Sequence, residues 1–366
     1  MKILILTCNT GQGHNSTANS IKEKFQKYNI QCDSADALSF VSKNMSDFIG
    51  NMHTKLYRYA PVLFDRGYEL AEKNPSIFAD DSVAYNFFCL GIKKLEAFIQ
   101  ENGYTGIICV HPFSALMATE LIKNKTFNLK TAFVATDYTC SPGVAESNLD
   151  AYFIPHENLI GEFIACGVPE EKLIPSGIPV KDAFYHSGDK NLARRELSIP
   201  YSSRHILMMC GSMGCGPMEE LTERLKSIMP DNVYLTVVCG TNERLKRHID
   251  KFACKNIEVL GFTDKVSLLM DSADLYVTKA GGLSVTEAAT KRLPLVFIDA
   301  VSGCESYNRY FFLTRGMALA SNDQSRLPRL ILKRLLDDNA LKKQKETMRK
   351  EFYKNPAEII CDYFIK

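Results

Sequence analysis

The sequence of 366 residues has no tryptophan, no C-x-x-C pair and no long uninterrupted apolar run. Without a run of about 18 apolar residues, no segment is expected to span a bilayer. The apolar start at residues 3–6 is too short for a signal peptide. Its 12 cysteines lack the paired spacing of a structural zinc site. We therefore expect reduced, mostly buried thiols in a cytoplasmic protein without a structural metal.

The chain also has little net charge: it contains 44 Lys and Arg residues and 42 Asp and Glu residues, so the formal net charge is +2. This balance excludes a strongly basic nucleic-acid-binding protein, and we expect no nucleic-acid partner. A hydrophobic content of 46% excludes a disordered acidic chain. The length predicts two domains, each able to bury its own core.

Short apolar runs alternate with helical patterns along most of the chain, which is typical of α/β domains with parallel sheets. The expected strands are residues 3–6, 106–110, 131–135, 152–154, 205–210, 233–238, 257–260, 275–278 and 295–298. Residues 43–100 are aromatic-rich and read as helical, and Pro175, Gly177 and Pro179 indicate a domain junction. The tail at 327–366 reads as helical, broken in two by Pro356. We expect two Rossmann-like domains, at 1–185 and 186–350.

Two glycine-containing segments follow strands in the second half and are expected to bind a phosphate-bearing substrate. In the first, Gly211, Ser212, Met213 and Gly214 precede a helix, whose N-terminus attracts anions. An ordinary strand-to-helix turn is the alternative. The loop is neither a G-x-G-x-x-G fingerprint nor a Walker A loop.

The second segment runs from Lys279 to Glu287 and is more specific. Gly281 and Gly282 permit close backbone approach to a diphosphate, and Ser284 is expected to cap the helix. Glu287 is placed to accept both hydroxyls of a ribose, or to complete a capping box with Ser284. The remaining substrate-binding residues expected in this half are Leu283, Cys304, Glu305 and Asn308, and the family resemblance given below adds Gly261 and Phe262.

Imidazole and carboxylate groups at strand ends mark the first half. His14 follows the first strand, within the segment Gly11, Gln12, Gly13, His14 and Asn15. A histidine there can act as a general base, although a lone histidine is more often structural. His111 stands directly after a second expected strand, and Asp137 is the second residue after a third. We take His14 and Asp137 as candidate catalytic residues, and Gly11, Gly13, Asn15 and His111 as substrate-binding residues.

Together these motifs resemble the diacylglycerol glycosyltransferases, the group that contains plant monogalactosyldiacylglycerol synthase and is related to the N-acetylglucosaminyltransferase of lipid II synthesis. The Gly-Gln-Gly-His opening resembles theirs, and the Lys279–Glu287 segment is similar to the donor motif of the wider family, glycosyltransferase family 28. The smaller motifs at Thr136-Asp137, Gly177-Ile-Pro-Val, Gly261-Phe and Gly303-Cys-Glu fall in the same order. The resemblance covers roughly residues 1–320.

The resemblance implies a GT-B fold, with two Rossmann-like domains facing across a cleft and a last helix, at 351–366, crossing back to the first domain. It further implies an inverting transfer of a hexose from a UDP-sugar, which is a donor substrate rather than a cofactor, to a membrane lipid such as diacylglycerol. Metal-dependent glycosyltransferases hold their ion with an Asp-x-Asp pair, and this sequence has none. Helix N-termini and glycine-loop amides are then expected to stabilise the leaving diphosphate.

Two departures from the family pattern affect the substrate. Relatives carry glutamine where this chain has Cys304, and a thiol cannot replace its amide hydrogen bonds. The plant enzymes carry a tryptophan in the loop after Thr-Asp, whereas residues 139–148 contain no aromatic residue. The hexose, the acceptor, the number of transfers and the oligomeric state are left open by the sequence.

A peripheral membrane surface is expected on the first domain, at the inner face of the cell membrane. Basic and aromatic residues interleave there, as on monotopic proteins: Lys55, Tyr57, Arg58, Tyr59, Phe64, Arg66 and Tyr68. Helices packed on the first sheet would show a similar spacing. Two other functions compete with transfer, namely a UDP-N-acetylglucosamine 2-epimerase, which shares the architecture, and a catalytically silent UDP-sugar-binding protein, which the cysteine at 304 allows.

Overall fold

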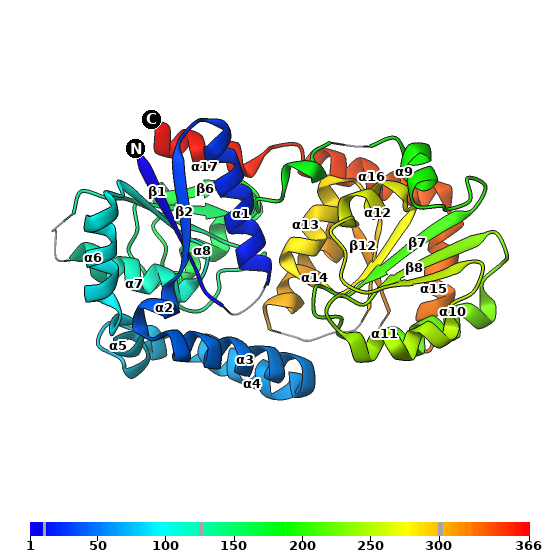
Figure 1. Cartoon of the computed structure of the whole chain (residues 1–366), viewed down its shortest axis with the longest axis horizontal. Coiled ribbons are helices and arrows are strands. Elements are labelled where there is room, and N and C mark those ends of the chain that lie inside the picture. Colours follow the sequence, from blue (N-terminus) through cyan, green and yellow to red (C-terminus); the bar gives the residue numbers. More distant parts are fainter. Residues whose placement is uncertain (10–11, 124–126, 187, 299–302, 322) are drawn as a thin grey trace. The chain divides into compact units, whose positions relative to one another are not determined.

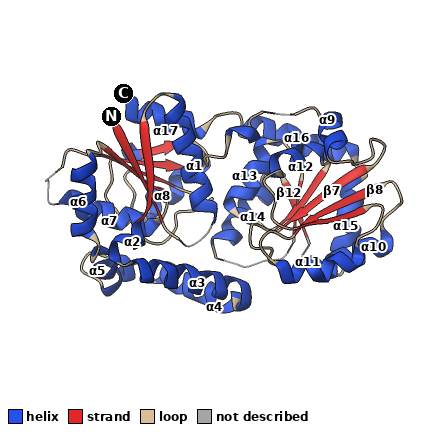
Figure 2. Ribbon diagram, viewed as in Figure 1, coloured by secondary structure: helices blue, strands red, loops and turns tan. Residues whose placement is uncertain are grey.

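The computed structural model describes residues 1–9, 12–123, 127–186, 188–298, 303–321 and 323–366. The chain forms two compact units, each built on a six-stranded parallel sheet with helices (Figures 1 and 2). The first unit comprises Met1–Lys181, Ser302–Tyr307 and Lys354–Lys366, and the second comprises Asp182–Val301 and Asn308–Tyr353. No helix in the described part of the chain is long and apolar enough to cross a membrane.

The sheet of the first unit has the strand order β2-β1-β3-β4-β5-β6. Its strands are β1 (Lys2–Thr7), β2 (Gln31–Asp36), β3 (Gly106–Cys109), β4 (Lys130–Val134), β5 (Ala151–Ile154) and β6 (Leu173–Pro175). β2 pairs with one edge of β1, whereas β3 pairs with the other edge and starts the run β3-β4-β5-β6. The strand order therefore reverses between β1 and β3. Parallel α/β sheets bind ligands at such a reversal, beyond the carboxyl ends of the strands.

Apolar residues of two helices that lie far apart in the sequence cover one face of this sheet. Ile21 and Phe25 of α1 share a core cluster with Ile360 and Phe364 of α17. A side chain at Gly106 of β3 would come within 3 Å of the Phe364 ring, so glycine is required at that contact. The helices of this unit are α1 (Gln12–Lys27), α2 (Ala37–Val41), α3 (Lys43–Tyr59), α4 (Pro61–Lys73), α5 (Val83–Cys89), α6 (Ile92–Asn102), α7 (Pro112–Lys123), α8 (Ile160–Cys166) and α17 (Pro356–Ile365), with short 3₁₀ turns at Pro75–Phe78, Glu157–Leu159 and Glu170–Lys172.

The sheet of the second unit has the order β12-β11-β10-β7-β8-β9, so its reversal lies between β7 and β10. Its strands are β7 (Arg204–Met209), β8 (Val233–Val238), β9 (Ile257–Leu260), β10 (Leu275–Thr278), β11 (Leu295–Phe297) and β12 (Ala318–Ala320). The helices are α9 (Lys190–Glu196), α10 (Met218–Ile228), α11 (Glu243–Ile249), α12 (Val266–Ser272), α13 (Gly282–Thr290), α15 (Leu327–Leu335) and α16 (Asp338–Glu351), with 3₁₀ turns at Asp182–Phe184 and Asp250–Phe252. A further helix, α14 (Cys304–Thr314), is divided between the units, with residues 304–307 in the first and 308–314 in the second.

The structure confirms the α/β class and contains each of the nine expected strands to within one residue at either end. The three strands that the sequence analysis omits, β2, β6 and β12, are all edge strands. β2 is polar, and β6 and β12 have three residues each, so they carry little hydrophobic signal. Pro175, expected in a junction, ends β6. The tail is broken twice rather than once, because Pro356 starts α17 and a second break separates α15 from α16.

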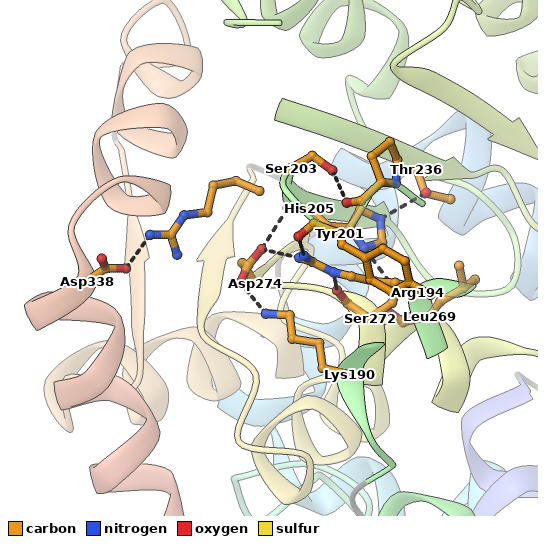
Figure 3. A network of polar contacts seen from close by, with 12 residues as sticks. Lys190, Arg194, Tyr201, Ser203, His205, Thr236, Leu269, Ser272, Asp274 and Asp338 are labelled. Atoms are coloured by element: carbon orange, nitrogen blue, oxygen red, sulfur yellow. Dashed lines mark hydrogen bonds and ion pairs between the residues drawn. The ribbon is translucent and has the colours of Figure 1, made fainter. Parts of the chain in front are cut away.

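A buried polar network ties α9 to the amino-terminal ends of β7 and β10 (Figure 3). Asp274, which precedes β10, pairs with Arg194 at 2.8 Å and also with Lys190. The same carboxylate accepts the backbone N–H of His205 at 2.8 Å. The His205 ring, which is fully buried, lies 3.0 Å from Thr236 Oγ1 and 3.1 Å from Ser272 Oγ. Because this network lies at the end of the sheet opposite the reversal loops, its role is structural.

Candidate active site

In the first unit, the strand reversal brings the loops after β1 and β3 together at His14. His14 lies in the first turn of α1, and its Nδ1 is 2.7 Å from the carbonyl oxygen of Val110, the residue after β3. A carbonyl can only accept a hydrogen bond, so Nδ1 carries the proton and Nε2 keeps its lone pair. Burial of the ring lowers the pKa of His14 below its usual 6.5. The imidazole is therefore neutral near pH 7 and oriented as a base.

Two further residues at strand ends fix this ring. Thr136 Oγ1, after β4, lies 3.2 Å from His14 Nδ1. His111 packs edge-on against His14, with ring centroids 4.7 Å apart and an interplanar angle of 68°. His111 Nδ1 accepts the backbone N–H of Phe113 at 3.1 Å, so the proton of its neutral ring is on Nε2. The structure thus brings His14 and His111 together.

Asp137, the other predicted catalytic residue, follows Thr136 and is partly exposed. Its carboxylate lies near the phenol of Tyr68 in α4. Burial is the main cause that raises the pKa of Tyr68, and the charge of Asp137 adds to it. Gly13 and Asn15 share the first turn of α1 with His14, whereas Gly11 lies outside the described residues.

In the second unit, the strand reversal brings Lys279, after β10, beside the glycine loop after β7. Gly211 and Gly214 have φ of +70° and +57°, which favour glycine. A Cβ at Gly211 would come within 3.1 Å of the Lys279 side chain, so that side chain lies directly over Gly211. A Cβ at Gly214 would collide with the Cys239 carbonyl oxygen at 2.2 Å. Partly exposed backbone and an ammonium group thus meet here, as anion binding requires.

The helix that follows Lys279 starts differently from the sequence prediction. The N-cap of α13 is Gly281, and no side chain caps the helix. Ser284 stands within the first turn, three residues after the N-cap Gly281, so the expected cap and capping box are wrong. With Gly281 at the cap, the backbone N–H groups of the first turn are not occupied by a capping side chain. Glu287 is 8% exposed in the second turn of α13.

The other expected donor residues lie at different positions in the structure. Gly261 and Phe262 follow β9, and the Phe262 side chain is 71% exposed. Asn308 of α14 is fully buried and donates from Nδ2 to the carbonyl of Ala280 at 2.9 Å, so it supports the loop before α13. Cys304 and Glu305 start α14 and are grouped with the first unit. Ser212 and Met213 are partly exposed in the glycine loop, and Leu283 and Gly282 belong to the first turn of α13.

Sequence reasoning missed two residues that shape these sites. Thr136 was identified only as part of a motif, although it contacts His14. The carbonyl of Val110 sets the tautomer of His14, yet a backbone group has no side-chain signature in a sequence. The signal available was position, because Val110 ends one predicted strand and Thr136 directly follows another. Within the ranges described above, no group of three or more His, Cys, Asp or Glu side chains is arranged to hold a metal ion.

Solved structures of similar shape define the class of fold. MurG of Acinetobacter baumannii aligns over 99% of this chain and 98% of its own, with a TM-score of 0.67 and 14% identity. The spinosyn rhamnosyltransferase SpnG covers both chains fully, with a TM-score of 0.67 and 12% identity. A UDP-N-acetylglucosamine 2-epimerase also aligns, at a TM-score of 0.61, over 100% of this chain and 97% of its own at 11% identity. The fold is GT-B, and fold alone does not separate transfer from epimerisation.

Sequence comparison identifies the family. Residues 14–180 match the family model of monogalactosyldiacylglycerol (MGDG) synthase, and residues 205–362 match the C-terminal domain of glycosyltransferase family 28. The chain therefore belongs to the diacylglycerol glycosyltransferases related to glycosyltransferase family 28. A processive diacylglycerol beta-glucosyltransferase of Bacillus cereus is 25% identical over 99% of this chain and 92% of its own length. One from Bacillus cytotoxicus is 24% identical over 100% and 93%.

Proposed function

We propose that this glycosyltransferase moves a hexose from a UDP-sugar to a diacylglycerol-like lipid, with inversion and without a metal ion. The observation that carries the proposal is the position of His14 at the strand reversal, with its protonated Nδ1 2.7 Å from the Val110 carbonyl. A neutral imidazole held in this tautomer can take the proton from an acceptor hydroxyl as that oxygen attacks the anomeric carbon. Direct attack of this kind inverts the configuration of the sugar.

The second unit would hold the donor. Lys279 and the backbone N–H groups of Gly281 and Gly282 lie where a diphosphate would receive a positive charge and several hydrogen bonds. Negative charge grows on the diphosphate as the glycosidic bond breaks, so these fixed donors stabilise the transition state more than the ground state. Glu287 would accept the ribose hydroxyls. Among relatives of known structure, the S. aureus MnaA co-structure contains UDP on the same fold, at 16% identity and a TM-score of 0.63 over 100% of this chain and 96% of its own.

The lipid side of the proposal rests on α3 and α4. Their exposed apolar side chains are Phe48, Met52, Val62, Leu63 and Leu70, each at least 44% exposed. Phe48, Met52 and Leu56 line an apolar hollow of about 380 Å³ on α3. Lys55 and Arg66 are exposed on the same helices. Apolar side chains beside basic ones are typical of a surface that binds the headgroup region of a bilayer.

This surface differs in composition from the one expected from sequence. Tyr68 is partly buried against the segment after β4 rather than exposed. The side chains of Tyr57, Arg58, Tyr59 and Phe64 lie outside the described ones. α3 nevertheless lies near the loop between β1 and His14, because Gly50 of α3 packs directly against Asn9, two residues after β1.

The test is transfer from labelled donors to vesicles that contain diacylglycerol. The protein is incubated with UDP-glucose, UDP-galactose or UDP-N-acetylglucosamine, with and without EDTA, and the lipid is extracted. We expect label in the lipid fraction from at least one donor, with β linkage if the donor is α, and no loss on chelation. Conversion of UDP-N-acetylglucosamine to its epimer without lipid would instead indicate an epimerase. UDP binding without any product would indicate a silent binding protein.

A further inference from the structure

The side-chain amide of Asn308 contacts the loop that leads into α13. Asn308 is fully buried, in the part of α14 that belongs to the second unit. Its Nδ2 donates a hydrogen bond to the carbonyl oxygen of Ala280 at 2.9 Å, although 28 positions separate the two residues in the sequence. Ala280 is buried and directly precedes Gly281, the N-cap of α13. A side chain of α14 thus holds the backbone at the start of the neighbouring helix (Figure 1).

Packing within the second unit fixes the half of α14 that carries Asn308. Four residues further along the helix, Phe312 is fully buried and packs edge-on against Phe297 of β11, with ring centroids 6.3 Å apart. Arg315, directly after the helix, forms an ion pair with Glu351 of α16 at 3.0 Å. These contacts anchor this half of α14 to the sheet and to α16. The position of the Asn308 amide is therefore set by the core of the unit.

Peptide geometry gives this hydrogen bond a consequence for Gly281. The peptide between Ala280 and Gly281 is trans, so its carbonyl and its N–H point in opposite directions. Because the Ala280 carbonyl is turned toward Asn308, the N–H of Gly281 points away from that side chain. Gly281 is partly exposed, whereas Ala280 and Gly282 on either side of it are buried. The polar group that this peptide presents to a ligand is thus the N–H and not the carbonyl.

The preceding peptide is held in a similar way. Thr278, the last residue of β10, is fully buried, and its Oγ1 donates to the carbonyl oxygen of Lys279 at 3.2 Å. The Lys279 side chain lies over Gly211, as described above. Carbonyl oxygens carry partial negative charge and would repel a diphosphate, whereas N–H groups attract it. Both carbonyls before the N-cap of α13 therefore accept hydrogen bonds from buried side chains.

We propose that Asn308 is a positioning residue of the diphosphate site, which keeps the Gly281 N–H rather than the Ala280 carbonyl facing a nucleoside diphosphate. Without the amide, the buried Ala280 carbonyl would lose its donor, which is costly unless the peptide rotates toward solvent. Such a rotation would replace an N–H by an oxygen at the N-terminus of α13, where an anion binds most favourably. Asn308 thus acts through Gly281 and does not itself touch the donor. This inference rests on the donor half of the function proposed above.

Two substitutions at Asn308 remove the donated hydrogen bond at nearly constant side-chain size. In Asn308→Asp, measured at pH 8, an ionised carboxylate cannot donate to the Ala280 carbonyl, and Asn308→Leu removes the donor without adding a charge. Calorimetry measures the affinity for UDP, and competition measures the affinity for uridine, which lacks the diphosphate. We expect UDP to bind about tenfold more weakly, the scale of one hydrogen bond to a charged group, and uridine to bind unchanged. An equal loss for both ligands, or no loss for UDP in a folded variant, would overturn the proposal.

Gln344→Leu is the matched control, because Gln344 is another buried side-chain amide of the second unit that donates to a backbone carbonyl. Its Nε2 lies 3.1 Å from the carbonyl oxygen of Met317, which precedes β12 at the end of the sheet opposite the loop before α13. We expect this variant to be less stable and to bind UDP normally. Equal weakening of UDP binding in Gln344→Leu and Asn308→Leu would mean a general loss of stability and would overturn the positioning role.

Failure of this inference and failure of the proposed function give different results. An unsubstituted protein that binds no UDP would count against the proposed donor. The crystal structure of Asn308→Leu would then still decide the orientation of the peptide between Ala280 and Gly281. A rotated peptide would support the role of Asn308, and an N–H that still points away from α14 would overturn it. Normal UDP binding without transfer to lipid would count against the proposed function alone.

Discussion

Arg194 Nη2 and Asp274 Oδ2 form an ion pair at 2.8 Å in which the two side chains are only 6% and 8% exposed (Figure 3). The pair joins α9 to the strand ends of β7 and β10. Its strength depends on the whole network, because Asp274 also accepts the backbone N–H of His205. Removing one partner leaves a buried charge uncompensated, which is more costly than never having formed the pair.

Asp274→Asn is therefore expected to lower the free energy of unfolding of the second unit by about 3 kcal/mol or more. The matched control is Asp338→Asn, which breaks an ion pair with Arg204 whose side chains are 34% and 72% exposed. The control should lose less than about 1 kcal/mol, as exposed pairs do. Urea denaturation of both variants measures the difference. Equal losses would contradict the structural role of the buried network.

His205 gives the second unit a specific pH dependence. Burial lowers the pKa of His205 from 6.5 to about 4, so the unfolded chain takes up a proton at a higher pH than the folded one. The stabilisation is complete above pH 6.5 and is lost as the pH falls from 6.5 toward 4, with a total on the order of 3 kcal/mol. His205→Gln should be less stable at pH 7 but should show a flatter profile across this window. Urea midpoints at pH 4.5, 5.5 and 7 compare the two slopes.

Gly211→Ala is expected to weaken UDP binding about tenfold, because the added methyl group would displace the Lys279 side chain and strain a left-handed backbone. Gly103→Ala is the matched control. Gly103 has a similar φ of +66°, and among the described residues nothing lies within 4 Å of its added Cβ. Calorimetry with UDP on both variants separates displacement of Lys279 from backbone strain. Normal UDP affinity in a folded Gly211→Ala protein would show that Lys279 does not bind the diphosphate.

Glu287→Ala should weaken UDP binding by roughly 1–3 kcal/mol, the scale of charge-assisted hydrogen bonds to the ribose. UDP and uridine monophosphate share the ribose, so calorimetry should show a similar loss for both nucleotides. An unchanged affinity for UDP in a folded variant would mean that Glu287 serves only the structure of α13.

His14→Ala should lower turnover by about 10²–10⁴-fold and leave UDP binding by the second unit intact. Because burial lowers the pKa of His14, the acid limb of the pH–rate profile should lie below 6.5. Turnover, UDP affinity and thermal stability are measured on the same variant, with Asp137→Asn beside it. Normal turnover in a stable His14→Ala protein would exclude His14 as the base and favour Asp137.

The central strands were predictable because their side chains are apolar on both faces, as in residues 3–6 and 275–278 of the two sheets. The edge strand β2 was not predicted, because its residues are mostly polar and form no apolar run. The position of His14 followed from its place after a strand, but its tautomer depends on the Val110 carbonyl, which is 96 residues away in the sequence. The cap of α13 was mispredicted because the helix already starts at Gly282, with Gly281 in an extended conformation (φ −71°, ψ 130°) at the N-cap.

The packing of α17 on the first unit determines when that unit can finish folding during synthesis. Ile360 and Phe364 fill the same core cluster as Ile3 and Ile5 of β1, at the opposite end of the chain. Domains generally fold in the order in which a ribosome produces them, the N-terminal one first. Here the first unit leaves the ribosome with part of its apolar sheet face uncovered, while the second unit can close around its own core. The later-made unit can therefore complete its fold first, and the exposed face of the earlier one is the surface that chaperones would protect until residue 364 has been made.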